Sequence, residues 1–411
     1  MTKELLQELL EDPDRDTFHG AAPVVSYDPD QDEPGFLEGI SNDALNKTRL
    51  IRRGNDHGHY AILADQPAND EEEERVDPVL KRWRSARPTV LRDSLKHLTH
   101  HADAGIELFE RLSDPADLRP WISEAELPEG LTANSQDDPI EDSERDLKKI
   151  SFDDPRSEEG RAWLKLAKLS NHPDDDSLRL RIGFGRERSD DASPILDRQR
   201  LISALGRSLL PGMDDLCADA QLASKLSKLL RGPALLTQPL AYWNRPGGGA
   251  LFHHDAFGEN SPNGQRGVLY AQVTGETFWL ALSINDLAAR VREITEAMTL
   301  GELPELREHL YPEDGMQPLL PILADEDLLR EELGMPGCGR FASLVNYGPA
   351  FTAWLADSGH ACVLGPGDAI LLPNHGVHHT CMHSVFCVSD HTTYALSVAV
   401  RLDEELAPAN P

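Results

Sequence analysis

Runs of hydrophobic positions, interrupted by short polar or Gly/Pro turns, predict short strands in the second half of the chain. The stretches are apolar and rich in β-branched and aromatic side chains, as half-buried or buried strands are. The predicted strands cover residues 268–273, 277–282, 361–364, 369–373 and 394–400. Gly and Pro punctuate the turns at 274–276 and 365–368. Short apolar strands joined by such turns are typical of a jelly-roll barrel, whose mouth can hold a ligand.

Helical periodicity dominates much of the remaining chain. Residues 162–169 and 196–230 are predicted to be helical, the second set broken near residues 211–212, while 178–184 alternates like a strand. Between the barrel strands, residues 284–332 again have a helical pattern. The predicted fold class is therefore α+β. The predicted regions are 1–160, mostly helical and loop-rich; 161–235, a strand plus helices that support the barrel; and 236–405, the barrel with a helical insertion at about 284–340.

Two distant segments carry candidate metal ligands. His253 and Asp255 are two residues apart, which places both side chains on the same face of a strand. The turn at 365–368 leads through Pro373 to His378, which supplies a second imidazole. Two histidines and one carboxylate on one face of a cation, with the opposite face open, are typical of a non-haem Fe(II) oxygenase.

The order of these segments resembles the JmjC-type branch of the cupin superfamily, the Fe(II)- and 2-oxoglutarate-dependent oxygenases. His253-x-Asp255 is similar to the motif on the family's early barrel strand, and residues 272–279 are similar to its Gln-x-x-Gly hairpin. Residues 365–378 resemble its Gly-Asp-x-x-x-x-Pro turn and distal histidine. The resemblance spans roughly residues 238–401, with a long interruption. It implies a double-stranded β-helix core with a helical N-terminal region and a helical insertion, and Fe(II) held by His253, Asp255 and His378.

The co-substrate position departs from the family pattern. A lysine two residues after the hairpin glycine often pairs with 2-oxoglutarate in the family, and Thr277 stands at that position here. A threonine hydroxyl donates one hydrogen bond but no charge-assisted pairing. Other side chains are expected to compensate, the cations being Arg401, Arg245 and Arg266 and the hydrogen-bond donors Tyr242, Asn244 and Tyr394. Of these, Tyr242, Asn244 and Arg401 are the candidate co-substrate ligands beside Thr277.

The resemblance implies hydroxylation of a C–H bond. The substrate class is an amino acid, a peptide or protein, or another small polar molecule. Asp255 argues against the halogenating variant, in which a small residue replaces the carboxylate. Two alternatives stay open: a cupin metalloenzyme that does not use 2-oxoglutarate, which Thr277 favours, and a non-catalytic cupin binding protein.

Other histidines compete for a metal-binding role. His101 and Asp103 also form a His-x-Asp triplet, but helical spacing would point them to different sides. His97 and His101, four apart on a helix, are able to share a metal, although a solvated helical face is the simpler interpretation. Near the predicted ligands, His254 is expected to face away from the site, and His379 to lie behind the ligands or to bond the backbone.

Charge and cysteine content limit the partners. The formal charge of −31 over 411 residues repels nucleic acid and anionic membranes, and it favours either a cationic substrate or solubility alone. Five cysteines without close CxxC spacing fit a reducing cytosol, so a cytoplasmic location is expected. No apolar run of roughly 18 residues is present, so no membrane span is expected. The expected partner is a small molecule or peptide, and a homodimer is compatible with the sequence.

Overall fold

Helices and antiparallel sheets together build this chain, as the α+β prediction requires. The computed structural model describes residues 24–27, 45–63, 78–140, 144–153, 161–185, 195–256, 264–313 and 315–403, and every statement below concerns these residues. The strands are β1 (Val24–Tyr27), β2 (Leu45–Arg52), β3 (Asn55–Leu63), β4 (Thr89–Leu91), β5 (Thr132–Ala133), β6 (Asp146–Asp153), β7 (Ala162–Lys168), β8 (Leu178–Phe184), β9 (Ala234–Trp243), β10 (Gly249–His253), β11 (Gln265–Thr274), β12 (Thr277–Ser283), β13 (Ala361–Leu364), β14 (Ala369–Pro373), β15 (Cys381–Cys387) and β16 (Tyr394–Leu402).

Eight successive strands, β9 to β16, divide between two facing sheets. Strands β10, β15, β12 and β13 form a four-stranded sheet in that order. Strands β14, β11, β16 and β9 are neighbours in a nine-stranded sheet. Because the sequence order crosses repeatedly from one sheet to the other, residues far apart in the chain meet between the two sheets. The five predicted strands all exist in the structure, as β11, β12, β13, β14 and β16.

The larger sheet continues beyond these strands. Strands β8, β7, β6 and β5 extend it past β9, and β4 borders β14. The prediction of a helix over 162–169 is wrong, because these residues form β7. Leu164 and Leu166 pack in a hydrophobic core, while Trp163 and Lys165 alternate with them and are buried too. Because both faces of β7 are buried, the segment lacks the alternation of polar and apolar residues that normally identifies a strand. Its alanine, leucine and lysine residues have high helix propensity, and the segment was therefore predicted to be helical.

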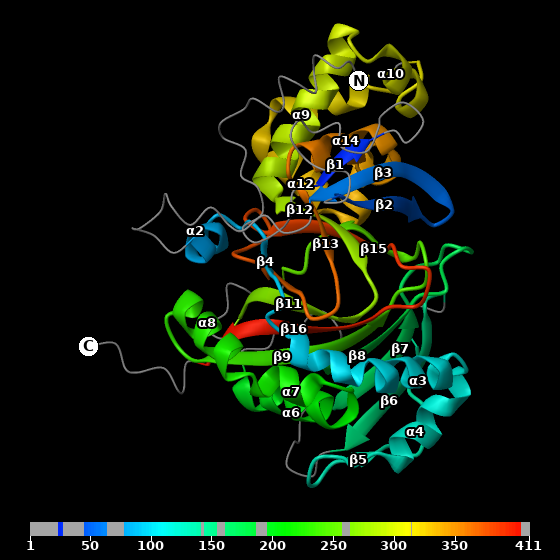
Figure 1. The fold of residues 1–411 in the computed structure, drawn as a ribbon, viewed down its shortest axis with the longest axis vertical. Coiled ribbons are helices and arrows are strands. Elements are labelled where there is room, and N and C mark those ends of the chain that lie inside the picture. Colours follow the sequence, from blue (N-terminus) through cyan, green and yellow to red (C-terminus); the bar gives the residue numbers. More distant parts are fainter. Residues whose placement is uncertain are drawn as a thin grey trace.

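The helices form two groups on opposite sides of the strand layers (Figure 1). Their bounds are α2 (Pro78–Arg84), α3 (Ala102–Leu112), α4 (Leu118–Glu124), α6 (Leu196–Leu209), α7 (Met213–Ala218), α8 (Ala220–Leu230), α9 (Ile284–Leu300), α10 (Pro304–Leu310), α11 (Leu320–Ala324), α12 (Glu326–Gly334), α13 (Ala342–Tyr347) and α14 (Pro349–Asp357). Four 3₁₀ segments accompany them in the described part: η2 (Lys96–His101), η3 (Pro115–Asp117), η4 (Gln317–Leu319) and η5 (Pro336–Phe341).

The predicted helical segments in the second half of the chain are confirmed. The segment 196–230 is helical and breaks where predicted, since Gly212 has φ +82°, a left-handed conformation that suits glycine. The insertion between β12 and β13 is helical from Ile284 and continues to Asp357, beyond the predicted residue 340. The described part of residues 1–160 contains six strands besides its helices.

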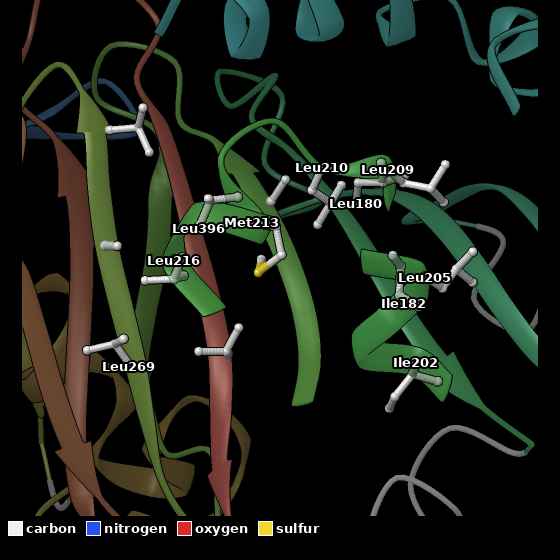
Figure 2. Close-up of a cluster of buried hydrophobic side chains, with 14 of the residues drawn as sticks. Leu180, Ile182, Ile202, Leu205, Leu209, Leu210, Met213, Leu216, Leu269 and Leu396 are labelled. Atoms are coloured by element: carbon white, nitrogen blue, oxygen red, sulfur yellow. The ribbon is translucent and has the colours of Figure 1, made fainter. Parts of the chain in front are cut away.

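One hydrophobic core lies between the nine-stranded sheet and the helices below it in Figure 1. Figure 2 shows Leu180 and Ile182 of β8 and Leu269 of β11 near helices α6 and α7. Leu205 of α6 and Met213 of α7 belong to the same cluster and are fully buried. Burying a side chain of this size contributes roughly 1.5–3 kcal/mol, so this core anchors the larger sheet.

A second core covers the outer face of the four-stranded sheet. Phe278 and Leu280 of β12 pack there with Val291 of α9, Leu329 of α12 and Phe341 of η5. The helical insertion therefore supports the smaller sheet from outside. Among the described residues, no helix combines the length and the apolar character that crossing a membrane requires.

The third core fills the space between the two sheets. It contains Val268 and Tyr270 of β11, Trp279 of β12, Ile370 of β14 and Val385 of β15. Since side chains alternate along each strand, every second residue of these strands points into this interior. Polar residues at such inward-facing positions are candidates for binding a metal or a substrate.

Candidate metal centre

Strands β10 and β15 bring two histidines together. They pair antiparallel, and His253 of β10 is opposite His383 of β15. Their rings are 4.2 Å apart between centroids. Gly249 lets β10 approach β15 this closely, because a Cβ atom there would lie only 2.0 Å from the carbonyl oxygen of Val385.

Asp255 completes a three-residue cluster. Its Oδ1 lies 3.8 Å from Nε2 of His253, and its Oδ2 lies 3.5 Å from Nε2 of His383. One potential ligand atom from each of the three side chains lies within 4.8 Å of the others. Two ligands at right angles, with bonds of about 2.1 Å to a first-row divalent metal, lie about 3.0 Å apart, so small side-chain shifts would close this set around an ion.

The position of His383 follows from strand alternation. Its neighbours two residues away, Cys381 and Val385, belong to the interior core between the sheets. His383 is 3% exposed, and its ring stacks against Trp279 with 5.7 Å between centroids and 24° between planes. The side chain of Asp255 is 33% exposed. The cluster is therefore closed on the side of His383 and more open on the side of Asp255.

Backbone carbonyls orient both imidazoles. Nδ1 of His253 lies 2.7 Å from the carbonyl oxygen of Leu251, and Nδ1 of His383 lies 3.4 Å from that of Cys381. A carbonyl oxygen only accepts hydrogen bonds, so this geometry assigns the proton to Nδ1 of each ring. The lone pair of each Nε2 then faces Asp255, which is the arrangement of histidine ligands whose outer nitrogen bonds the protein.

The protonation states also suit a cation. Burial and the neighbouring charge of His253 lower the pKa of His383 to about 3, so its imidazole is neutral at physiological pH. Burial alone would raise the pKa of Asp255, but the charges that His383 and His253 carry when protonated outweigh it, so the pKa lies below the ordinary value. A neutral imidazole and an ionised carboxylate are the ligand forms that bind metals.

His378 does not belong to this cluster. It is exposed in the turn between β14 and β15, where its charge acts on Asp327 of α12. The group of potential ligands that the structure brings together with His253 and Asp255 therefore contains His383 and not the predicted His378. No strand was predicted over residues 381–387, which form the buried strand β15.

Neighbouring histidines lie where strand alternation predicts. Nε2 of His254 lies 3.2 Å from the carbonyl oxygen of Gly334, so this ring faces the helical insertion. His379 contacts the carbonyl oxygen of Arg84 at 3.0 Å, and His375 that of Trp83 at 2.6 Å. These backbone contacts hold both rings against the C-terminal end of α2.

Thr277 is fully buried, and its hydroxyl is already occupied. It donates to Oε1 of Gln272 at 2.8 Å and accepts from Nε1 of Trp279 at 2.9 Å. Tyr270 donates to the same Oε1 atom at 3.2 Å. Because a hydroxyl has one proton to donate, Thr277 cannot offer a further hydrogen bond without breaking this network.

Tyr242 lies close to the cluster. Burial and the charge of Asp255 raise the pKa of Tyr242 to about 12, and its ring lies 6.0 Å from that of Tyr270. Asn244 follows on the same segment and is 1% exposed. Within the described residues Oδ1 of Asn244 has no hydrogen-bond partner, and a buried polar atom of this kind is expected to meet a ligand group or water.

The predicted cations differ in position. Arg401 is fully buried on the interior side of β16, and its Nε donates to Thr237 at 3.1 Å. Its partner in the β-ladder is Gln265, whose side chain donates to the backbone carbonyl of Asp255. Arg245 instead contacts Thr392 at 3.3 Å in an exposed position.

Tyr394 faces away from the interior. Its hydroxyl donates to the carbonyl oxygen of Pro211 at 2.8 Å, and its ring belongs to the core on the outer face of the sheet. Arg266, the third predicted cation, lies at a register shift of β11 between Gln265 and Gly267.

Sequence reasoning missed Arg181. This residue of β8 is close enough to Asp255 and Tyr242 for its charge to lower the pKa of both. In the alternation of β8, Leu180 and Ile182 face the outer core, so Arg181 is on the opposite face. The alternating pattern of 178–184 was recognised, but nothing in the sequence places β8 beside β9.

Comparison with known proteins gives distant likenesses. No protein-family model matches this chain, and no curated protein matches it. Among solved structures, AviO1 from Streptomyces viridochromogenes Tue57 is similar, with 13% identity, 82% of this chain and 100% of that chain covered, and a TM-score of 0.30.

Two further similar structures are of YcfD, a ribosomal oxygenase from Escherichia coli. One has 14% identity, covers 71% of this chain and 52% of that chain, and has a TM-score of 0.19. The other, in complex with cobalt and 2-oxoglutarate, has 12% identity, the same coverage and the same TM-score. This chain thus matches about half the length of those chains. Oxygenases are therefore among the solved structures that are similar to this chain.

Proposed function

We propose that this chain is an Fe(II)- and 2-oxoglutarate-dependent oxygenase. The observation that carries the proposal is the convergence of His253, Asp255 and His383 at the meeting of two strands. Two imidazoles and one carboxylate form the ligand set that leaves a face of an octahedral Fe(II) ion open. Bound there, the iron would supply the activation of O2.

The strand order supports a double-stranded β-helix around this site. Eight strands alternate between two sheets, with β14, β11, β16 and β9 facing β10, β15, β12 and β13. Such a jelly roll holds its ligands between the sheets, and His383 and Trp279 lie there. The helical insertion and the helices below the larger sheet then support the two walls from outside.

The chain's own side chains have distinct proposed roles. Leu251 and Cys381 orient the two imidazoles through their carbonyls, and Gln265 restrains the backbone of Asp255 through its carbonyl. Trp279 closes the inner side of His383 against water. These contacts fix the ligands before a metal arrives, which lowers the entropy cost of binding.

Binding of 2-oxoglutarate requires a cation other than the family lysine. We assign this role to the guanidinium groups nearest the interior, Arg401 and Arg181, with Tyr242 and Asn244 as hydrogen-bonding partners. Guanidinium is suited to a two-point grip on a carboxylate. Thr277 then acts from behind the site, because its hydroxyl bonds Gln272 and Trp279.

The proposed reaction is hydroxylation of a C–H bond in an amino acid, a peptide or protein, or another small polar substrate. The overall charge of −31 favours a cationic substrate, whereas Arg181 favours an anionic group beside the metal. An anionic co-substrate next to Arg181 agrees with the local positive charge. A cationic substrate that approaches from outside agrees with the negative charge of the whole protein.

One observation favours a second function. The hydroxyl of Thr277 is committed to the network with Gln272 and Trp279, so the position of the family lysine offers neither charge nor a free donor. A metalloenzyme of the same fold that does not use 2-oxoglutarate would need neither. The metal centre is common to both proposals.

An anaerobic Fe(II) titration of the metal-free protein, followed by addition of 2-oxoglutarate and O2, tests the proposal. We expect one Fe(II) per chain at the site and conversion of 2-oxoglutarate to succinate that depends on Fe(II). Slow conversion without substrate is sufficient, because uncoupled turnover reports on the co-substrate site. His383→Ala is the matched variant that should lose both signals.

The outcomes separate the alternatives. Fe(II) binding without any succinate would support the metalloenzyme that does not use 2-oxoglutarate. Absence of Fe(II) binding would leave a barrel used for binding alone and refute the proposal.

A further inference from the structure

A second cluster of metal-ligand side chains lies outside the barrel interior. It joins the end of η2 to α7, two segments more than 100 residues apart in sequence. The members are His100, His101 and Asp215, each with a ligand atom within 4.8 Å of the others. This cluster shares no residue with the centre formed by His253, Asp255 and His383.

One carboxylate oxygen is the focus of the cluster. Oδ2 of Asp215 lies 2.7 Å from Nε2 of His101 and 3.4 Å from Nε2 of His100. The two imidazole rings lie 3.8 Å apart between centroids. Ligands of a tetrahedral zinc ion with bonds of about 2.0–2.1 Å lie about 3.3 Å apart, so His100 already has the required separation from Asp215.

Local backbone geometry positions both histidines. Nδ1 of His100 donates to the carbonyl oxygen of His97, which leaves the lone pair of Nε2 toward Asp215. The ring of His101 packs on Gly212, where a Cβ atom would lie only 3.0 Å from Cδ2 of that ring. A glycine at this point lets α7 approach η2 closely enough for its first turn to meet both rings.

The 3₁₀ conformation of η2 places a third histidine, His97, beside the cluster. Residues three apart eclipse each other in a 3₁₀ helix, so His97 lies on the same side as His100. Nε2 of His97 lies 3.5 Å from Oδ2 of Asp219, whose Oδ1 caps α8 through the amide of Leu222 at 2.7 Å. The prediction paired His97 with His101 at α-helical spacing, whereas the structure groups His100 with His101.

We infer that His100, His101 and Asp215 form a second divalent-cation site, of the class that binds Zn²⁺. Two imidazoles and a carboxylate with a position left for water match the three-ligand zinc sites of proteins. The hydrogen bond from His101 to Asp215 is replaced by the metal, which displaces the proton to solvent. Bound there, the ion ties η2 to α7 and so fixes helices on the outer face of the larger sheet.

Zinc titration of the metal-free, full-length protein by calorimetry tests the inference. We expect two sites in the wild type: the barrel centre and this cluster. The double variant His100→Ala/Asp215→Asn should keep one site, and His383→Ala should also keep one. His100→Ala alone, at a ring that is 61% exposed, should weaken one site at least tenfold without affecting the fold.

A matched control is His391→Ala. His391 is an exposed histidine 2.8 Å from Asp390, and the described residues offer no third ligand there. This variant should bind two zinc ions like the wild type. If the double variant binds as much zinc as the wild type, or if His383→Ala abolishes all zinc binding, the inference is wrong.

A second measurement covers the case in which His383→Ala does not fold. With the barrel centre saturated anaerobically by Fe(II), Zn²⁺ should still raise the melting temperature of the wild type. The increase should be smaller in the double variant, where only exchange of Fe(II) for Zn²⁺ at the barrel centre remains, and an equal increase in both proteins would refute the site. Failure of Fe(II) to bind would count against the proposed oxygenase but not against this second site, because the two clusters are separate.

Discussion

At the scale of single residues, replacement of His383, the third proposed ligand, tests the metal centre most directly. His383→Ala should lower Fe(II) affinity by more than about 100-fold, since loss of a ligand costs more than loss of an outer-sphere contact, which costs about 10–100-fold. His378→Ala should leave the affinity unchanged, because His378 is exposed in a turn away from the cluster. Anaerobic equilibrium titration of both variants measures the difference.

Comparison of the two variants distinguishes His383 from His378 as the ligand, provided that both proteins fold. Circular dichroism should show that both proteins retain their secondary structure. Equal loss of iron in both variants, or loss in His378→Ala alone, would contradict the corrected ligand set.

Two of the three proposed ligands were predictable because they lie in one short segment. His253 and Asp255 are two residues apart, and spacing of two is a local property of a strand. His383 was not predicted, because choosing among His375, His378, His379 and His383 requires the bounds of β15. Cys381 and Val385 share the face of His383, and this alternation was the signal that could have identified it.

The proposed co-substrate side chains were less predictable. The sequence shows that Thr277 stands where the oxygenases that it resembles often have a lysine, but not that its hydroxyl is occupied by Gln272 and Trp279. Arg181 depends on the pairing of β8 with β9, a contact between residues some 60 positions apart. Such pairings are set by packing of the whole sheet and leave no local pattern.

At the scale of elements, α3 docks on the larger sheet through a glycine. A Cβ atom at Gly105 would lie 2.1 Å from the ring of Tyr394 on β16. The carbonyl of Gly105 also accepts a hydrogen bond from Nε1 of Trp243 at 2.8 Å. The helix therefore lies closer to the sheet than any side chain larger than hydrogen would allow.

Gly105→Ala should lower the free energy of unfolding by about 1–3 kcal/mol, although alanine favours a helix by up to about 1 kcal/mol over glycine. The reason is that the buried ring of Tyr394 must move. Urea denaturation measures the change. Ala104→Gly, on the exposed side of the same helix, is the control and should lose only about 1 kcal/mol. A more stable Gly105→Ala protein would show that α3 does not pack as described.

The flanking turns and the burial of each strand explain which strands could be predicted from the sequence. Strands β11, β12, β13 and β14 each border a turn that contains Gly or Pro, and these four strands and β16 were all predicted. The segment 162–169 was assigned to the wrong class because both faces of β7 are buried. Local composition therefore identifies a strand reliably only where one face meets solvent or a turn marks its end.

At the scale of the whole molecule, buried histidines make the fold sensitive to acid. Burial and the charge of Arg52 lower the pKa of His57 to about 4, and burial also lowers the pKa of His360. Both are neutral in the folded protein, whereas in the unfolded chain each has a pKa of about 6.5. Below pH 6.5 the unfolded state therefore binds more protons.

The free energy of unfolding should consequently be greatest above pH 6.5 and fall as the pH decreases from 6.5 toward 4. Each such histidine contributes up to about 1.4 kcal/mol per pH unit in that range. Urea midpoints at pH 7.5 and pH 5 measure the loss. His57→Gln removes one titrating group and should show a smaller loss than the wild type, and an identical pH dependence would contradict the role of His57.

The extended sheet has a further consequence at its margins. It ends in β4, with three residues, on one side and in β5, with two residues, on the other. A long, flat outermost strand invites strands of other molecules to add by backbone pairing, and very short ones give them little to pair with. Among the described residues, the nine-stranded sheet is thereby expected to resist the addition of strands at its own two edges.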